Sequence, residues 1–303
     1  GSAAGGRGGQ TAAGSGGAGT SASVIGSGGS GGRGGASAGA GGVAAAGRSS
    51  SGGGAGSGSG SQASGGTGGV GGTGGVTAAA SCSGLFCEDF EVGQLDKAVW
   101  TKTQISSGNS VTVQDKQVAH GKYAAQFHAK GGTDYSVILH DGLPAALQKH
   151  YFGRLYFYAT DFPNENGGHT AYVWSSNGIS GFPYMDHHLE VASYHESAQV
   201  TWQMTYWTGD GPEYIGTGGK IPQAKWFCLE WEFNDAPDQI AIWVDGDAKQ
   251  GAAFRNINNG ASGLLGKMTS LGLGFRTWHA KGAPDIDIYI DDVVLDTERV
   301  GCL

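Results

Sequence analysis

The feature that most constrains this chain is a change of composition at about residue 80. Residues 1–80 contain no Asp, Glu or aromatic residue, yet they hold 34 of the 60 glycines. All 8 Trp, all 4 Cys and all 26 acidic residues fall in 81–303. A tract without large apolar side chains cannot bury enough surface to offset the entropy lost on ordering. The sequence therefore predicts a disordered low-complexity linker over 1–80 and one folded domain over 81–303.

The charge of the two segments excludes some partners. The linker carries three arginines and no acid, which leaves the domain with a net charge of about −11. Because phosphate binding needs a basic surface, we expect no nucleic-acid partner. No apolar run reaches the ~18 residues of a membrane span, so none is expected. We expect a monomer that is secreted or tethered to the cell surface.

The cysteines lie at positions 82, 87, 228 and 302, and no two have the CxxC spacing of a zinc site. An even number beside a linker typical of secreted proteins indicates two disulfides and an oxidising compartment. Four cysteines allow three pairings. Of these we favour Cys82–Cys87 and Cys228–Cys302.

Alternation with a period of two dominates the domain, and a short helix is indicated only at 144–150. Clusters of Gly, Asn, Asp and Pro separate the alternating segments. This pattern predicts an all-β domain, a β-sandwich or jelly roll. The predicted strands are 110–115, 123–129, 151–160, 169–175, 186–194, 199–207, 225–233, 239–245, 271–279 and 286–295.

Several predicted strands place aromatic or charged side chains opposite their apolar face. If these strands belong to one sheet, the side chains line one surface. Aromatic rings stack on the C–H faces of sugars, and charged groups hold hydroxyls or carboxylates, so such a surface favours polysaccharide. On alternation, Tyr172 and Trp174 share a face. The side chains assigned to the polar surface are Arg154, Tyr156, His188, Glu190, Tyr194, Arg276 and Trp278.

Several motifs, in order along the chain, resemble one family. They are Cys87–Gly93, Asp96–Trp100, Val118–His120, Trp226–Trp231, Ile240–Gly246 and Ile290–Cys302. Together they resemble the secreted cellulose-induced jelly-roll proteins of fungi and their bacterial relatives, which are akin to glucuronan and alginate lyases. The resemblance spans about 82–303. It implies a concanavalin A-like β-jelly-roll sandwich and a polysaccharide substrate or ligand.

The resemblance also implies a structural Ca²⁺ that ties the first strand to the last. The matching positions are Asp89, Glu91 and Asp291, with backbone oxygens near His120–Tyr123. Oxygen ligands from distant segments suit this hard cation. The family pairing of cysteines supports the bond between Cys228 and Cys302.

The cleft motif departs from the family pattern at two positions. The family has His-Leu-Arg where this chain has His188-Leu-Glu190, and Trp-Glu where this chain has Phe275-Arg276. The family Gln that follows is Tyr194 here. An exchange of both charges predicts a reversed ion pair between Glu190 and Arg276 on neighbouring strands.

The resemblance favours a lyase that cleaves a uronic-acid-containing polysaccharide by β-elimination. The C5 proton of the uronate is acidified when a cation neutralises the carboxylate, and a His or Tyr then serves as base and acid. The candidates for base and acid are His188, Tyr194 and Tyr206; those for neutraliser are Arg154 and Arg276. The residues expected to contact substrate are Glu190, Tyr156, Tyr172, Trp174 and Trp278.

Two other functions remain open. One is a non-catalytic carbohydrate-binding protein that assists plant cell-wall degradation. The other, less favoured, is a glycoside hydrolase. The Glu-x-Asp-x-x-Glu motif of retaining β-glucanases is absent. Along a strand Asp186 and Glu190 would be ~13 Å apart, too far for hydrolysis, whereas Glu230 and Glu232 would be ~7 Å apart, within the inverting range.

Overall fold

The computed structural model describes residues 82–303 except 133, 164–166, 183–186, 197–198, 209–210, 236–238, 254–265 and 279–283. The described residues form two antiparallel sheets with one 3₁₀ turn, η1 (Ala145–Leu147), at the predicted short helix. The all-β prediction is therefore confirmed. The predicted linker lies outside the described residues. None of the helical structure described here is long and apolar enough to cross a membrane.

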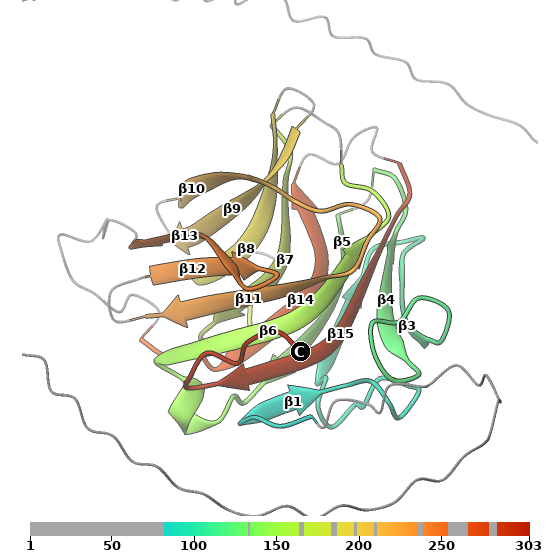
Figure 1. The fold of residues 1–303 in the computed structure, drawn as a ribbon, viewed down its shortest axis with the longest axis horizontal. Coiled ribbons are helices and arrows are strands. Elements are labelled where there is room, and N and C mark those ends of the chain that lie inside the picture. The colour runs from blue at the N-terminus through green and yellow to red at the C-terminus, as the bar shows by residue number, and fades with distance from the viewer. Residues whose placement is uncertain are drawn as a thin grey trace, which may run out of the picture. The chain divides into compact units, whose positions relative to one another are not determined.

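The larger sheet has eight strands, and β1 pairs with β15 beside the main path. Figure 1 shows β15 running between β6 and β4, with the C-terminus close to β6. In spatial order its strands are β13 (Asp247–Ala253), β12 (Gln239–Val244), β11 (Phe227–Asn234), β6 (His150–Ala159), β15 (Ile286–Asp296), β4 (Ala124–Ala129) and β3 (Ser110–Gln114), with β1 at Phe86–Glu88.

The second sheet has seven strands and carries the candidate site. In spatial order its strands are β10 (Gly211–Lys220), β9 (Gln199–Thr208), β8 (His188–Glu196), β7 (His169–Ser176), β14 (Ser270–Trp278), β5 (Tyr135–Asp141) and β2 (Lys102–Ile105).

All ten predicted strands are present, with ends shifted by one or two residues. The structure adds β1, β2, β5, β10 and β13. Strand β5 was missed because its centre, Ser136–Leu139, is buried on both faces and does not alternate. Strands β1 and β2 are only three and four residues long, whereas β10 and β13 are poor in large apolar residues.

The core lies between the two sheets and draws on both. Leu155 and Phe157 of β6 belong, with Leu189 and Val191 of β8, to one continuous apolar cluster. Phe157 contacts the ring of Tyr172 at a centroid distance of 5.1 Å. For β8 and β14, the sequence assigned the apolar residues to the correct face.

A β-bulge changes the assignment on β7. The register shifts between Ala171 and Val173, and the paired strand β14 shifts between Leu273 and Arg276. As a result Tyr172 points into the core, whereas Trp174 lies on the opposite face. The prediction that these two side chains share a face was wrong. Gly274 permits the bulge, because its φ is +126° and a Cβ there would lie 2.4 Å from the Ser136 carbonyl oxygen.

Candidate carbohydrate-binding surface

The face of the seven-stranded sheet that points away from the core carries a cluster of polar side chains, here called the Glu190 cluster. Glu190 is at its centre and has no solvent exposure. Its neighbours come from β7, β8, β9 and β14, so one sheet assembles them all. The members are His169, His188, Glu190, Gln203, Trp207 and Arg276.

Both carboxylate oxygens of Glu190 are fully engaged. Oε1 lies 2.9 Å from Nε2 of His188 and 3.0 Å from Nη1 of Arg276. Oε2 lies 2.8 Å from Nε2 of His169 and accepts a hydrogen bond of 2.9 Å from the indole N–H of Trp207. The reversed ion pair expected from the sequence is thus present, and His188 is beside it.

Strand register explains why these long side chains fit on one face. One row across the sheet reads Arg276, Ala171, Ala192 and Gln203. The two alanines have no exposed surface and leave space above the middle strands. Arg276 from this row meets Glu190, as do His169, His188 and Trp207 from other rows.

The environment fixes the charge of Glu190. Burial raises the pKa of its carboxyl, but Arg276, His188 and the hydrogen bond from His169 together outweigh burial and hold it well below its usual range. The carboxylate therefore stays ionised at neutral pH. Each oxygen of this ionised carboxylate contacts two groups of the protein, so Glu190 links the side chains around it.

Aromatic side chains border the cluster. Trp207 stacks on the imidazole of His188, with centroids 5.8 Å apart and planes 8° from parallel. The guanidinium carbon of Arg276 lies 5.9 Å from the Trp207 ring centroid. The adjoining row reads Trp278, His169 and Tyr194. Trp278 is half exposed, at 50%. Tyr194 is partly exposed, so this row presents aromatic surface to solvent.

Trp174 lies on the same face, but it is buried. Its indole packs over Gly272, where a Cβ would come within 2.0 Å of Cε2, and it stacks on Phe182 at 5.6 Å. Phe182 in turn contacts Tyr135. These contacts leave Trp174 only 1% exposed. Trp174 thus supports the surface from below, and the expectation that it contacts substrate is wrong.

Four further predicted site residues lie elsewhere. Tyr206 and Tyr172 belong to the core, where the Tyr172 hydroxyl bonds Ser193 at 2.7 Å. Arg154 and Tyr156 are on β6, in the other sheet, because the strands assumed to share one sheet are divided between two. These four residues therefore cannot act with the Glu190 cluster.

Arg154 and Tyr156 instead pack near the end of the chain. The Tyr156 hydroxyl accepts a 2.8 Å bond from the Leu303 amide, and the ring meets His120 edge-on at 4.4 Å. The guanidinium of Arg154 lies 5.9 Å from the Tyr156 ring. Burial raises the pKa of Tyr156, which makes it a poor base at neutral pH.

The carboxylates considered for hydrolysis also have structural partners. Glu230 is buried and accepts two bonds from Arg299, at 3.1 and 2.6 Å, and one from the Gly301 amide. Glu232 pairs with His150 at 2.8 Å. Asp186 lies outside the described residues. Neither Glu230 nor Glu232 faces the Glu190 cluster, since both are on the eight-stranded sheet.

Both favoured disulfides are present. Cys82 is joined to Cys87, and Cys228 to Cys302 across 74 positions of sequence. Glu230 lies beside the second pair. Because bonded cysteines offer no thiolate, this group is not a zinc site.

Two of the three acids expected to hold Ca²⁺ contact the 119–123 loop. Oε1 of Glu91 accepts bonds from the amides of Lys122 and Tyr123, at 2.8 and 3.0 Å. Oδ2 of Asp291 accepts bonds from the amides of Ala119 and His120, at 3.0 and 3.1 Å. Both acids therefore contact the same loop, through its backbone amides.

The charge of this region suits a cation. Asp291 and Asp292 are both buried, and Asp292 contacts His120. Burial raises the pKa of Asp291 to about 7, and the nearby charge of Asp292 adds to the effect. Asp89 uses one oxygen to cap the Glu91 amide. Among the described residues, no three of these acids bring ligand atoms within 4.8 Å of one another, so a cation would need to draw them together.

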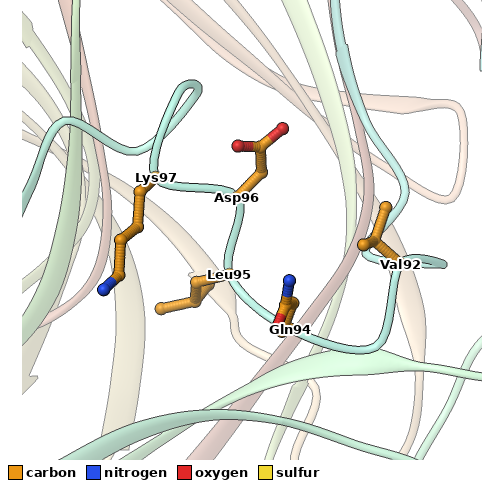
Figure 2. A pocket seen from close by; sticks show the side chains of 5 residues that line it. All are labelled: Val92, Gln94, Leu95, Asp96 and Lys97. Atoms are coloured by element: carbon orange, nitrogen blue, oxygen red, sulfur yellow. The ribbon is translucent and has the colours of Figure 1, made fainter.

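A hollow of about 480 Å³ lies on the segment after β1 (Figure 2). It is lined by Val92, Gln94, Leu95, Asp96 and Lys97. The Asp96 carboxylate and the Lys97 ammonium point away from each other in Figure 2, so the hollow offers no convergent set of ligands.

Comparison with known proteins places the fold. No family model and no curated protein matches the sequence. Among solved structures, the cellulose-induced protein Cip1 is 18% identical, with 72% of this chain and 100% of that chain covered and a TM-score of 0.52. A second structure comes from work on endo-acting O-glycanases with which human gut microbiota break down mucin. It is 14% identical, covers 72% of this chain and 100% of its own, and has a TM-score of 0.52.

The endo-β-1,4-glucuronan lyase of the fungus Trichoderma reesei is 15% identical. The match covers 71% of this chain and 96% of the lyase, with a TM-score of 0.49. The resemblance to cellulose-induced jelly-roll proteins that the motifs indicated is confirmed at the level of the fold by Cip1. At these identities the likeness establishes a shared jelly-roll fold.

Sequence reasoning missed three members of the Glu190 cluster: His169, Gln203 and Trp207. Plain alternation placed His169 opposite Trp174, because the bulge at Tyr172 is invisible in the sequence. Gln203 and Trp207 alternate with Trp202, Met204 and Tyr206, which form the core side of β9. The larger apolar volume of those three residues was the available signal for the orientation of β9.

Proposed function

We propose that this protein binds polysaccharide on the outer face of the seven-stranded sheet. The observation that carries the proposal is the Glu190 cluster, which holds Trp207 and Arg276 in fixed positions beside the half-exposed Trp278. Rigid aromatic side chains flanked by hydrogen-bond donors are what a sugar ring requires, since stacking and hydroxyl bonding then cost little ordering entropy. The fold shared with Cip1 supports the proposal.

A binding role accounts for the geometry better than the lyase does. Of the five candidate catalytic residues, Tyr206 is in the core and Arg154 is on the other sheet. His188 is only 1% exposed, and its Nε2 already contacts Glu190 and Arg276. The general base of a β-elimination must reach the C5 proton, and His188 is covered.

The lyase remains the second candidate because Arg276 and Tyr194 share the outer face. In that function Arg276 would neutralise the uronate carboxylate and Tyr194 would take the C5 proton. The glycosidic C4–O bond would then break with formation of a C4–C5 double bond, and the departing oxygen would take the proton from Tyr194. The product is an unsaturated uronate, which absorbs ultraviolet light.

One experiment separates the two functions. The protein is run through native gels that contain single soluble polysaccharides, both neutral glucans and uronans, and incubated in parallel with the uronans. Retardation without a rise in ultraviolet absorbance is the result expected for a binding protein. A rise in absorbance would establish the lyase, and neither signal would refute both.

We also propose a structural Ca²⁺ held by Asp89, Glu91 and Asp291 with backbone oxygens near Tyr123. Asp291 is buried on the last strand, and Asp89 and Glu91 directly follow the first strand, which pairs with the last. A cation that binds only the native state would raise its stability. Chelator should lower the melting temperature of the wild type, and Asp291→Ala should remove that response. Asp287→Ala, on the same strand but paired with His128, is the control. An unchanged melt with chelator would refute the site.

We propose an extracellular location, secreted or surface-tethered. Two disulfides in a domain of this size favour an oxidising compartment. The protein is proposed to act as a monomer. Its acidic domain makes nucleic acid a poor partner.

A further inference from the structure

We infer that the proposed carbohydrate surface selects uncharged sugars over uronates, and that Glu190 sets this selectivity. The inference rests on the proposed function, because it assigns the ligand class of that surface. The supporting observation is that Arg276 already forms an ion pair with the buried carboxylate of Glu190.

A uronate needs a cation with uncompensated charge. Among the described strands of the seven-stranded sheet, Arg276 is the only arginine. The sheet's two strand lysines, Lys102 and Lys220, are on its outermost strands β2 and β10. Arg276 is therefore the cation that a sugar carboxylate beside Trp278 and Trp207 would meet.

The charge of Arg276 is already compensated. Its Nη1 lies 3.0 Å from Oε1 of Glu190, and the side chain is 14% exposed while that of Glu190 is 0% exposed. Glu190 cannot turn away to release the guanidinium, because His169, His188 and Trp207 hold both of its oxygens. A sugar carboxylate bound at Arg276 would lie close to a second, fixed negative charge.

A neutral sugar hydroxyl is not repelled by the Glu190 carboxylate. The guanidinium has five N–H donors, and only those at Nη1 contact Glu190 and His188 in the described structure. The remaining donors can bond neutral hydroxyls, while Trp278 offers a ring face. The net charge of the domain, about −11, disfavours polyanions further. Neutral glycan is therefore the ligand class that fits.

The test compares two probes, a neutral β-glucan and alginate, by affinity electrophoresis at low salt. Wild type should be retarded by the neutral glucan at a concentration at least tenfold below that needed for alginate. Glu190→Gln keeps the shape of the side chain and removes its charge. It should move the ratio of alginate to glucan affinity at least tenfold toward alginate, and added salt should reverse the gain.

Glu232→Gln is the matched control, since it removes a carboxylate paired at 2.8 Å with His150 on the other sheet. It should leave the ratio unchanged. A melting curve establishes that each variant is folded. The wild-type preference tests the inference even if Glu190→Gln does not fold.

The outcomes separate the two proposals. Wild type that binds alginate as tightly as glucan overturns the inference and leaves the proposed function intact. Folded Glu190→Gln with an unchanged ratio, or a gain equalled by Glu232→Gln, also overturns it. Wild type that binds neither probe nor any other polysaccharide refutes the proposed function, and the inference fails with it.

Discussion

Glu190 and Arg276 should be energetically coupled, and a double-mutant cycle measures by how much. The perturbations are Glu190→Gln, Arg276→Gln and the double variant. Removing one partner of a buried pair costs roughly 3–5 kcal/mol, because the other charge stays buried without compensation. Arg276 reaches the surface and Glu190 keeps three other donors. We therefore expect about 2–4 kcal/mol for each single variant.

The double variant should lose less than the sum of the single losses. At a 3.0 Å contact the coupling energy should be ~1–3 kcal/mol, within the range of contacting pairs. The assay is urea unfolding followed by tryptophan fluorescence, with the slope against urea checked for two-state behaviour. As a control, Glu232→Gln combined with Arg276→Gln should be additive. Additivity within ~0.5 kcal/mol for Glu190 and Arg276 would refute the reasoning.

Three further predictions concern the scaffold. Burial lowers the pKa of His195 to about 4, whereas an unfolded histidine titrates at ~6.5. The contribution of His195 to stability should therefore be constant above that pH and fall by at most ~3 kcal/mol as pH drops toward 4. His195→Asn should flatten this slope in urea titrations, and an unchanged slope would exclude His195 as its source. Gly272→Ala should lower the free energy of unfolding by ~1–3 kcal/mol, because the new methyl group displaces Trp174. Gly216→Ala is the control and should cost less than ~1 kcal/mol, because nothing lies within 4 Å of its added Cβ. Equal losses in the two variants would contradict the packing of Trp174 over Gly272. Cys302→Ser removes the disulfide to Cys228, which spans 74 positions, and should lower the free energy of unfolding by up to ~4 kcal/mol. A loss below ~1 kcal/mol would show that this disulfide does not restrain the unfolded chain.

The sequence predicted whatever depends on local pattern or on matched motifs. Alternation located ten strands and placed Leu189 and Phe275 in the core, as observed. The exchange of charges between two motifs identified the contact of Glu190 with Arg276. In both cases the signal is carried by residues close in sequence or by a reciprocal change at two positions.

The wrong predictions concern features that depend on how strands distant in sequence are arranged. Nothing in the alternation of β6 shows which sheet it joins, so Arg154 was assigned to the wrong surface. The bulge at Tyr172 reverses the faces within β7 and requires Gly274 on another strand. The contacts of His169 and Trp207 with Glu190 depend on the pairing of distant strands, and the sequence therefore did not predict them.

The central claim is that polysaccharide binds the outer face of the seven-stranded sheet. The most direct measurement is affinity electrophoresis of Trp278→Ala beside Trp243→Ala. Trp278 is half exposed on that face, whereas Trp243 packs against Arg299 on the other sheet, at 4.5 Å. We expect Trp278→Ala to weaken binding about tenfold, equal to ~1.4 kcal/mol, and Trp243→Ala to leave it unchanged. Equal affinity of Trp278→Ala and wild type, or a loss confined to Trp243→Ala, would contradict the account.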